Sequence, residues 1–308
     1  MSEDAALPAT PAPIGTGAWV VLPTYEEAEN LPGIAAAILE ALPGGTLLVV
    51  DDASPDGTGQ LADRLAADDP RIRVRHRPGK AGLGRAYLDG FGVALAGGAG
   101  IVLQMDADWS HDPAVLPRLI APIEAGTADL VIGSRYTSGG GVQDWGLARR
   151  VISRGGSLFA KLVLRLPAND LTGGFKAWRA TTLSALPFEG VRAGGYVFQI
   201  EMTYRATRLG ARIREVPITF RDRRVGRSKM SRRIIVEALI VVVQLRAEEL
   251  RGGMPGRRPP TTGSEPSDDT APDGRGSSGS SKGRPAETAS LAEPRRTPAL
   301  DIPAGEGR

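Results

Sequence analysis

Short strand-like runs that alternate with helical patterns constrain the fold of this chain more than any other feature. The runs occupy residues 18–23, 46–52, 71–77, 100–108 and 128–135, and the helical patterns occupy about 27–41, 58–68, 84–96 and 113–125. Short strands of this kind, most of them apolar throughout, are typical of a parallel sheet covered by helices on both faces. We therefore predict an α/β fold, Rossmann-like, with a mostly parallel central sheet in a single domain.

Composition divides the 308 residues into three parts. Residues 1–17 are acidic and Pro-rich, and they lack the basic start and apolar stretch of a signal peptide. Residues 18–250 carry the alternating pattern, whereas residues 251–308 are rich in Gly, Pro, Ser and Thr with almost no large apolar side chains. Because such a tail cannot bury enough surface to offset its ordering entropy, we predict a low-complexity leader, one folded domain and a disordered tail.

The residue types exclude several classes of protein. The chain has no cysteine and two histidines, which argues against a disulfide scaffold, a thiol nucleophile and a multi-histidine zinc site. The net charge is only +3, but seven basic residues stand against one acid between Arg221 and Arg233, a patch that suits phosphates or an anionic membrane surface. Aromatic residues are few and no nucleic-acid-binding motif is present, so we expect no nucleic acid partner.

The chain contains no run of about 18 apolar residues, the length that a membrane-spanning helix needs. We therefore predict no transmembrane helix and a cytoplasmic protein. The apolar stretch at 234–245 is too short to cross a bilayer. It could pack in the core, touch lipid or dock on a membrane partner.

Polar residues gather where four of the predicted strands end. The first strand runs into "PTYEE", the second into "DDASPDG", the fourth into "DADWS" and the fifth into "GSRY". The carboxyl ends of parallel strands share one edge of the sheet, and ligands of open α/β sheets bind there. Any one of these segments could be only a capped loop, but together they predict a binding site at that edge.

The segment that indicates a specific chemistry most clearly is "DAD", which follows an apolar strand that we expect to be buried. Two carboxylates that leave a strand at alternate positions, Asp106 and Asp108, suit Mg²⁺ or Mn²⁺, and such an ion bridges protein to a diphosphate. Ser110 and Gln104 are candidates for a further oxygen ligand, and Ser110 is better placed because it comes just past the strand. The alternative is that the two acids cap the helix expected to open at Pro113.

Two further segments suggest contacts with a nucleotide. One carboxylate of the pair Asp51 and Asp52 could accept hydrogen bonds from a base or ribose, although the alternative is that the segment only forms a tight turn. The Gly-rich segment 77–90 lacks the G-x-G-x-x-G spacing of a dinucleotide fingerprint, because Tyr87 stands where the third Gly belongs. A loop with Lys80 and Gly82 that passes close to a sugar nucleotide fits better than a dehydrogenase.

Basic residues later in the chain suggest a phosphate site. Arg149 and Ser153 stand four apart and share one face of a helix predicted over 147–166. That helix has basic and apolar stripes, so it could lie on a membrane surface or be a core helix with solvated arginines. Arg223 and Lys229 could close over a phosphate, or they could be part of a solvated or membrane-facing basic run.

Asp170 is the acid of the segment "NDLTGGFKAWR". It could lie over a reacting sugar, serve as a base, or cap a turn.

As a set, these segments resemble one family, the polyprenol-phosphate (dolichol-phosphate) mannosyltransferases, which are inverting GT-A glycosyltransferases of family 2. The resemblance covers about residues 19–235 and rests on "LPTYEEAENL", "VVDDASPDGTG", "GLGRAYLDGF", "QMDADWSHDP", "IGSRYTSGGGVQDW", "RRVISRGG", "NDLTGGFKAWR", "GYVFQIEMTYRA" and "EVPITFRDRRVGRSKM". It implies a GT-A fold and the transfer of mannose from GDP-mannose to a polyprenyl phosphate with inversion. It also implies Mg²⁺ or Mn²⁺ as cofactor.

The resemblance also implies roles for individual residues. The donor nucleotide sugar would contact Pro23, Tyr25, Glu27, Asp52, Lys80, Gly82, Asp106, Ala107 and Asp108. The metal would be held by Asp106, Asp108 and Ser110, although some family members carry Gln at the position of Ser110. The acceptor phosphate would be gripped by Arg135, Arg149 and Ser153, with Arg223 and Lys229 as further phosphate contacts from a mobile loop. The catalytic residues would be Asp108, Arg135 and Asp170.

The resemblance further implies a peripheral enzyme on the cytoplasmic face of the membrane, held by the membrane surface or by a separate integral membrane anchor protein. Two alternatives remain. One is a glucosyltransferase that uses UDP-glucose with the same lipid. The other is a non-catalytic protein that binds a membrane surface, against which the intact acids at 106 and 108 and the intact arginines at 135 and 149 speak.

Overall fold

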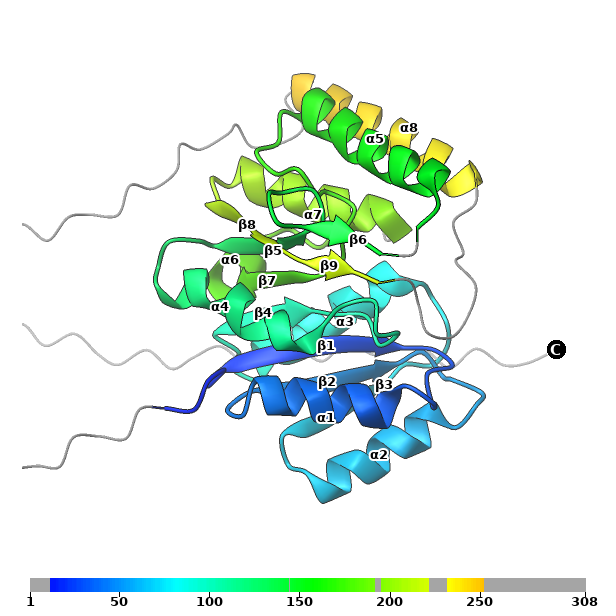
Figure 1. The fold of residues 1–308 in the computed structure, drawn as a ribbon, viewed down its shortest axis with the longest axis vertical. Helices are drawn as coiled ribbons and strands as arrows, with labels where there is room; N and C mark the ends of the chain where they lie inside the picture. Colours follow the sequence, from blue (N-terminus) through cyan, green and yellow to red (C-terminus); the bar gives the residue numbers. More distant parts are fainter. Residues whose placement is uncertain (1–11, 144, 192–194, 222–231, 252–308) are drawn as a thin grey trace, which may run out of the picture. The chain divides into compact units, whose positions relative to one another are not determined.

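The computed structural model describes residues 12–143, 145–191, 195–221 and 232–251 (Figure 1). They belong to the first of two units of the chain, Met1–Thr262. Residues 1–11 of the predicted leader and residues 252–308 of the predicted tail lie outside the described residues. The elements in chain order are β1 (Ala18–Thr24), α1 (Leu31–Ala41), β2 (Thr46–Asp51), α2 (Thr58–Asp68), β3 (Ile72–His76), α3 (Leu83–Ala96), β4 (Ile101–Gln104), the 3₁₀ turn η1 (Pro113–Val115), α4 (Leu116–Glu124), β5 (Leu130–Ser134), β6 (Gly141–Val142), α5 (Leu147–Leu164), β7 (Lys176–Arg179), α6 (Ala180–Ser184), α7 (Gly195–Arg208), β8 (Ile213–Pro217), β9 (Thr219–Phe220) and α8 (Arg232–Leu250).

Seven strands form the central sheet in the order β3-β2-β1-β4-β7-β5-β8. Neighbouring strands run parallel except around β7, which is antiparallel to both β4 and β5. The predicted mostly parallel α/β sheet is therefore confirmed. The sequence pattern does not predict strand β7, because "KAWR" is short and half of its residues are charged. Lys176 is nevertheless fully buried. Strands β6 and β9 pair separately.

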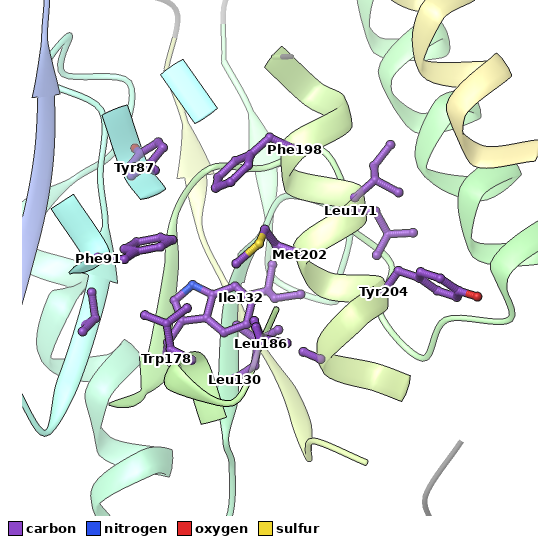
Figure 2. Packing of buried hydrophobic residues seen from close by; sticks show 14 of the residues in the cluster. Tyr87, Phe91, Leu130, Ile132, Leu171, Trp178, Leu186, Phe198, Met202 and Tyr204 are labelled. Atoms are coloured by element: carbon purple, nitrogen blue, oxygen red, sulfur yellow. The ribbon is translucent and has the colours of Figure 1, made fainter. Parts of the chain in front are cut away.

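The sheet separates two apolar cores, and β1 shows how. Alternate side chains of a strand point to opposite faces. Trp19 and Val21 pack with the cluster that includes residues of α3, α5, α7 and α8, whereas Val20 and Leu22 pack with the cluster that includes α1 and α4. Figure 2 shows part of the first cluster, with Phe198 of α7 beside the rings from α3.

Helix α3 packs closely against the sheet at Gly90. A Cβ atom built on Gly90 would stand 2.4 Å from Cγ1 of Val21, so no larger residue fits there without a shift. The helix begins after Gly82, whose φ of +96° favours glycine. This close packing holds α3 against β1 and β2.

Several predicted boundaries need correction. The strand expected over 100–108 ends at Gln104, which leaves the two acids of "DAD" in a loop. The helix expected from residue 27 begins at Leu31, and the one expected over 113–125 opens as a 3₁₀ turn before α4. The helix expected over 147–166 ends at Leu164.

The apolar stretch at 234–245 belongs to α8, which packs beside α5 (Figure 1). Val242 and Leu245 are buried there, while Ile240 and Val243 are exposed. The stretch is thus partly a core segment. Within the described ranges, no helix has both the length and the apolar character needed to cross a bilayer.

Candidate active site

A cavity of about 370 Å³ lies at the carboxyl edge of the sheet, where the polar strand ends meet. Its volume falls in the range typical of small-ligand sites. The structure brings twelve of the predicted site residues to its wall: Pro23, Tyr25, Glu27, Asp52, Lys80, Gly82, Asp106, Ala107, Asp108, Ser110, Arg135 and Arg149. The wall also contains residues for which the sequence suggested no role: Thr24, Leu83, Ala86, His111, Trp145, Thr172, Gly173, Gly174, Gln199 and Phe220.

Backbone strain at the strand ends shapes this edge. Glu26, Ala53 and Trp109 have φ values of +61°, +54° and +62°, and they follow β1, β2 and β4. Non-glycine residues rarely adopt this left-handed region, and such residues cluster at functional sites. Sequence patterns carry no signal for this strain, because none of the three is a residue type that turns require.

The turn at Trp109 arranges the acidic segment. The backbone N–H of Ser110 donates to Oδ1 of Asp108 at 3.1 Å, and the hydroxyl of Tyr87 donates to Oδ1 of Asp106 at 2.8 Å. Burial, and then the negative charge of Asp106, raise the pKa of Tyr87 well above its usual value, so the hydroxyl remains a donor. The turn at Pro113 is capped by Asp112, not by Asp106 or Asp108, so the capping alternative is wrong.

These oxygens fit a divalent cation. Two carboxylates line the cavity with Ser110, whose buried Oγ has no hydrogen-bond partner in the described part of the chain. Hard cations such as Mg²⁺ and Mn²⁺ prefer such oxygen ligands, and Mg²⁺ commonly takes one or two carboxylates together with water and substrate phosphates. No cluster of three or more His, Cys, Asp or Glu side chains occurs among the described residues, so the rest of the coordination would come from those other sources.

The acids after β2 divide into a turn residue and a cavity residue. Asp51 accepts from the backbone and hydroxyl of Ser54 at 3.1 and 2.6 Å, which holds the loop. Asp52 lines the cavity and forms an ion pair with Arg77. On the same side, the ammonium of Lys80 lies 3.3 Å from the centre of the Tyr25 ring. This end of the cavity thus offers an aromatic ring, a cation and a carboxylate.

Strand β5, which lies beyond β4 as seen from β1, leads to a guanidinium group that is held by several hydrogen bonds. Arg135 follows β5 and donates from Nε and Nη2 to Asp170 at 2.7 and 2.6 Å, and Nη2 also donates to Thr172 at 2.8 Å. Burial alone would raise the pKa of Asp170, but the charge of Arg135 and its hydrogen bonds lower it below the ordinary value. Asp170 is therefore an ionised partner of Arg135, and the cavity wall does not include it.

A second guanidinium group comes from the first turn of α5. Arg149 lines the cavity and lies 4.1 Å from the centre of the Trp145 ring, an arrangement that stabilises a cation. Ser153, one turn further on, is absent from the wall and accepts from the hydroxyl of Tyr136 at 2.7 Å. The predicted phosphate contacts Arg223 and Lys229 lie outside the described residues.

Aromatic rings complete the wall near these cations. Phe220 meets Trp145 and His111 edge to face at 5.3 and 5.4 Å, and His111 stacks on Phe175 at 4.8 Å. Burial lowers the pKa of His111, so its ring is neutral at pH 7. The sequence gives little sign of these wall residues, because they are isolated aromatic positions in different segments.

The strand order and the polar cavity define an open α/β fold with a ligand site at the carboxyl edge of its sheet. The sequence matches the family described as glycosyl transferase family 2 over residues 19–186. It is 48% identical over 224 residues to an undecaprenyl-phosphate mannosyltransferase of Micrococcus luteus, covering 73% of this chain and 91% of that one. It is 46% identical over 226 residues to a polyprenol monophosphomannose synthase of Mycolicibacterium smegmatis, covering 73% and 85%.

Among solved structures, the fold is similar to glucosyl-3-phosphoglycerate synthase from Mycobacterium tuberculosis, crystallised with Mn²⁺, uridine diphosphate and phosphoglyceric acid. The TM-score is 0.55 and the identity 23%, over 75% of this chain and 78% of that one. This likeness supports the fold alone. The sequence relatives are much closer, and on them the chain belongs to glycosyltransferase family 2 and, within it, to the polyprenol-phosphate mannosyltransferases.

Proposed function

We propose that this enzyme transfers mannose from GDP-mannose to a polyprenyl phosphate, with inversion and with Mg²⁺ or Mn²⁺ as cofactor. The observation that carries the proposal is the charge arrangement of one cavity. Asp106 and Asp108 follow β4, Arg135 follows β5, and β7 lies between these strands. Two carboxylates suited to a metal–diphosphate and two guanidinium groups suited to a phosphate therefore line the same space.

The arginines would hold the acceptor. A phosphate is already anionic at neutral pH, so its oxygen needs no strong general base to attack. Arg135 and Arg149 present planar groups that match phosphate oxygens, and both lie near the ring of Trp145, at 5.4 and 4.1 Å from its centre. Catalysis then depends on alignment of the phosphate oxygen with the anomeric carbon and on charge compensation.

The acids would hold the donor. Asp106, Asp108 and Ser110 would bind the metal ion, which neutralises charge on the departing diphosphate when it is bound. Pro23, Tyr25 and Asp52 lie at the β1–β2 end of the cavity and would contact the nucleoside. With the diphosphate on one side of the sugar carbon and the lipid phosphate on the other, in-line displacement inverts an α-linked sugar to a β-linked product.

Asp170 is better suited to position the side chain of Arg135 than to contact the sugar directly. Both its oxygens accept from Arg135, and it is completely buried behind that side chain. It would keep the guanidinium group charged and aimed, and Arg135 itself would touch the substrate.

Incubation of the protein with labelled GDP-mannose, decaprenyl phosphate and Mg²⁺ tests the proposal. We expect an organic-soluble mannolipid, its loss with excess chelator, and recovery with added metal. Asp108→Asn should lose nearly all turnover, whereas Asp112→Asn, a change in the capping residue of η1, should keep it. Undiminished transfer in chelator would refute the metal part, and no mannolipid under any condition would refute the activity, as the non-catalytic alternative requires.

The same assay separates the donors and the stereochemistry. UDP-glucose in place of GDP-mannose should give little product, and a preference for it would favour the glucosyltransferase alternative. The one-bond coupling between C1 and H1 in the NMR spectrum of the product should show a β-linkage. An α-linkage would exclude inversion.

We further propose that α5 and α8 meet the surface of an anionic membrane. Each helix exposes an apolar stripe: Leu147, Val151, Leu158 and Leu162 on α5, and Val236, Leu239, Ile240 and Val243 on α8. Exposed apolar side chains gathered on one helix face are typical of interaction surfaces, and α5 adds the exposed Arg150 and Arg154. The same helix brings Arg149 to the cavity, so a lipid phosphate would reach the site from this side.

Sedimentation with vesicles that contain anionic phospholipid tests the surface. Leu158→Glu combined with Leu162→Glu should abolish binding, whereas Ile14→Glu, at an exposed apolar residue of the N-terminal segment, should not. Equal binding of both proteins would refute the surface. Binding only when a second membrane protein is present would favour the anchor-protein alternative.

A further inference from the structure

Gln199 of α7 is a buried polar side chain that the proposed chemistry leaves unexplained. It lines the cavity, is only 3% exposed, and neither its amide nitrogen nor its amide oxygen has a hydrogen-bond partner in the described part of the chain. Burial of a polar group without a partner is costly, so native structures rarely keep one without a reason. A buried primary amide at a cavity wall, with neither of its polar atoms bonded within the described residues, has donors and an acceptor left for a ligand.

The amide faces the same space as the first acid of "DAD". A Cβ atom built on Gly174 would lie 3.4 Å from Nε2 of Gln199 and 3.7 Å from Oδ2 of Asp106. Glycine at 174 therefore keeps open a small space that the amide and the carboxylate border together. Gly174 itself lines the cavity.

The scaffold holds Gln199 in this position. Its backbone carbonyl accepts from the ammonium of Lys176 at 2.8 Å and from the hydroxyl of Thr203 at 2.9 Å. The preceding residue, Phe198, stacks on Tyr87 with the ring planes 1° apart, and Tyr87 donates to Asp106. Figure 2 shows Phe198 pointing toward Tyr87. The amide and the carboxylate are thus positioned by one connected set of buried side chains.

The order of the strands indicates which part of the donor reaches this space. The proposed nucleoside contacts lie at β1 and β2, the diphosphate acids follow β4, and the acceptor arginine follows β5. Gly174 precedes β7, which lies between β4 and β5. Whatever occupies the space beside Gly174 therefore lies between diphosphate and acceptor phosphate, where the hexose must be.

We propose that Gln199 hydrogen-bonds a hydroxyl of the donor hexose and selects the sugar. This inference rests on the proposed function. An amide offers one acceptor and two donors, and a hydroxyl both donates and accepts, so the pair is complementary. A site built to bond a hydroxyl discriminates against a sugar that presents it differently, because the buried amide then stays unsatisfied. The amide thus distinguishes hexoses by the configuration of this hydroxyl, while the nucleoside contacts distinguish the bases.

Calorimetric titrations with Mn²⁺ present test this selection by comparing each sugar nucleotide with its own nucleoside diphosphate. For the wild type we expect GDP-mannose to bind more tightly than its epimer GDP-glucose. Gln199→Leu should weaken GDP-mannose about tenfold, leave GDP unchanged, and bring the two GDP-sugars to similar affinity. Gln199→Met, unbranched and of similar volume, provides a second variant, and thermal unfolding verifies that each variant folds.

Gln104→Leu is the matched control. Gln104 on β4 is also buried, and its amide nitrogen has no hydrogen-bond partner among the residues that the structure describes, but its amide oxygen accepts from the indole of Trp178 and it is absent from the cavity wall. It should lower stability without altering sugar selectivity.

Two outcomes would overturn the inference. An equal loss of GDP and GDP-mannose binding in both Gln199 variants would assign the residue to the metal or diphosphate, and unchanged selectivity would make it structural. Failure of the proposed function is visible separately. If the wild type binds UDP-glucose and not GDP-mannose, the donor proposal fails, and the ratio of UDP-glucose to UDP affinity then tests Gln199 in the same way.

Discussion

Arg135 and Asp170 form a bidentate ion pair in which both side chains are almost completely buried, with N···O distances of 2.7 and 2.6 Å. Removal of one partner from such a pair leaves an uncompensated buried charge. We therefore expect Asp170→Ala to lower the free energy of unfolding by about 3–5 kcal/mol. Urea denaturation measures this change.

The exposed pair of His76 and Asp63 is the control, because both side chains are more than half exposed. Asp63→Ala should cost less than about 1 kcal/mol. The double variant Arg135→Met with Asp170→Leu should be more stable than Asp170→Ala, yet inactive, since the phosphate contact is gone. A stable, fully active Asp170→Ala protein would contradict the proposal that Asp170 positions Arg135.

Tyr87 holds Asp106 through a hydrogen bond of 2.8 Å from the interior. A hydrogen bond to a charged group is worth about 1.5–3 kcal/mol, so Tyr87→Phe should weaken the binding of Mn²⁺ and GDP about tenfold or more. Tyr204→Phe makes the same chemical change at a hydroxyl that donates to Glu249, away from the cavity wall. Titration of both variants with metal and nucleotide should show the loss in Tyr87→Phe alone.

Arg149 and Arg150 are adjacent, but only Arg149 lines the cavity. Arg149→Ala should raise the KM for the lipid phosphate about ten- to hundredfold and change the KM for the sugar nucleotide little. With the lipid phosphate supplied in detergent, so that no membrane surface is present, Arg150→Ala, at an exposed side chain that reaches the carbonyl of Val142, should leave both constants near the wild type. Steady-state kinetics with each substrate varied in turn measures the split, and an equal rise of both constants would make Arg149 a structural residue.

Lys176 gives the stability a dependence on pH near neutrality. Burial lowers its pKa to about 7, although the negative charge of Asp170 acts in the other direction. Above about pH 7 the folded protein releases this proton while the unfolded chain keeps it, so stability rises with pH by up to about 1.4 kcal/mol per unit. Lys176→Met should flatten the rise between about pH 7 and pH 9, measured by urea denaturation.

Lys161→Met is the control for that measurement. Lys161 is only partly buried and donates to Asn169 at 2.6 Å. It should keep the slope of the wild type. An identical slope in all three proteins would show that Lys176 stays charged in the fold.

The sequence by itself determined the class of fold and the edge of the sheet that carries the site. Local patterns suffice for this, because strand and helix periodicity depend on neighbouring residues, and parallel strands must present their carboxyl ends together. Asp106, Asp108 and Arg135 were placed at strand ends, and all three line the cavity. The motifs also identified the family to which the chain belongs.

Only the tertiary structure decided how the site is held. Asp170 pairs with Arg135, 35 positions away, and Tyr87 supports Asp106, 19 positions away. The amide of Gln199 lies beside Gly174, which belongs to a different segment of the chain. No local pattern encodes such contacts, since they arise when separate strands and helices pack against each other. The antiparallel β7 is of the same kind, because a fully buried Lys176 is tolerable only where Gln199 and Thr203 accept its hydrogen bonds.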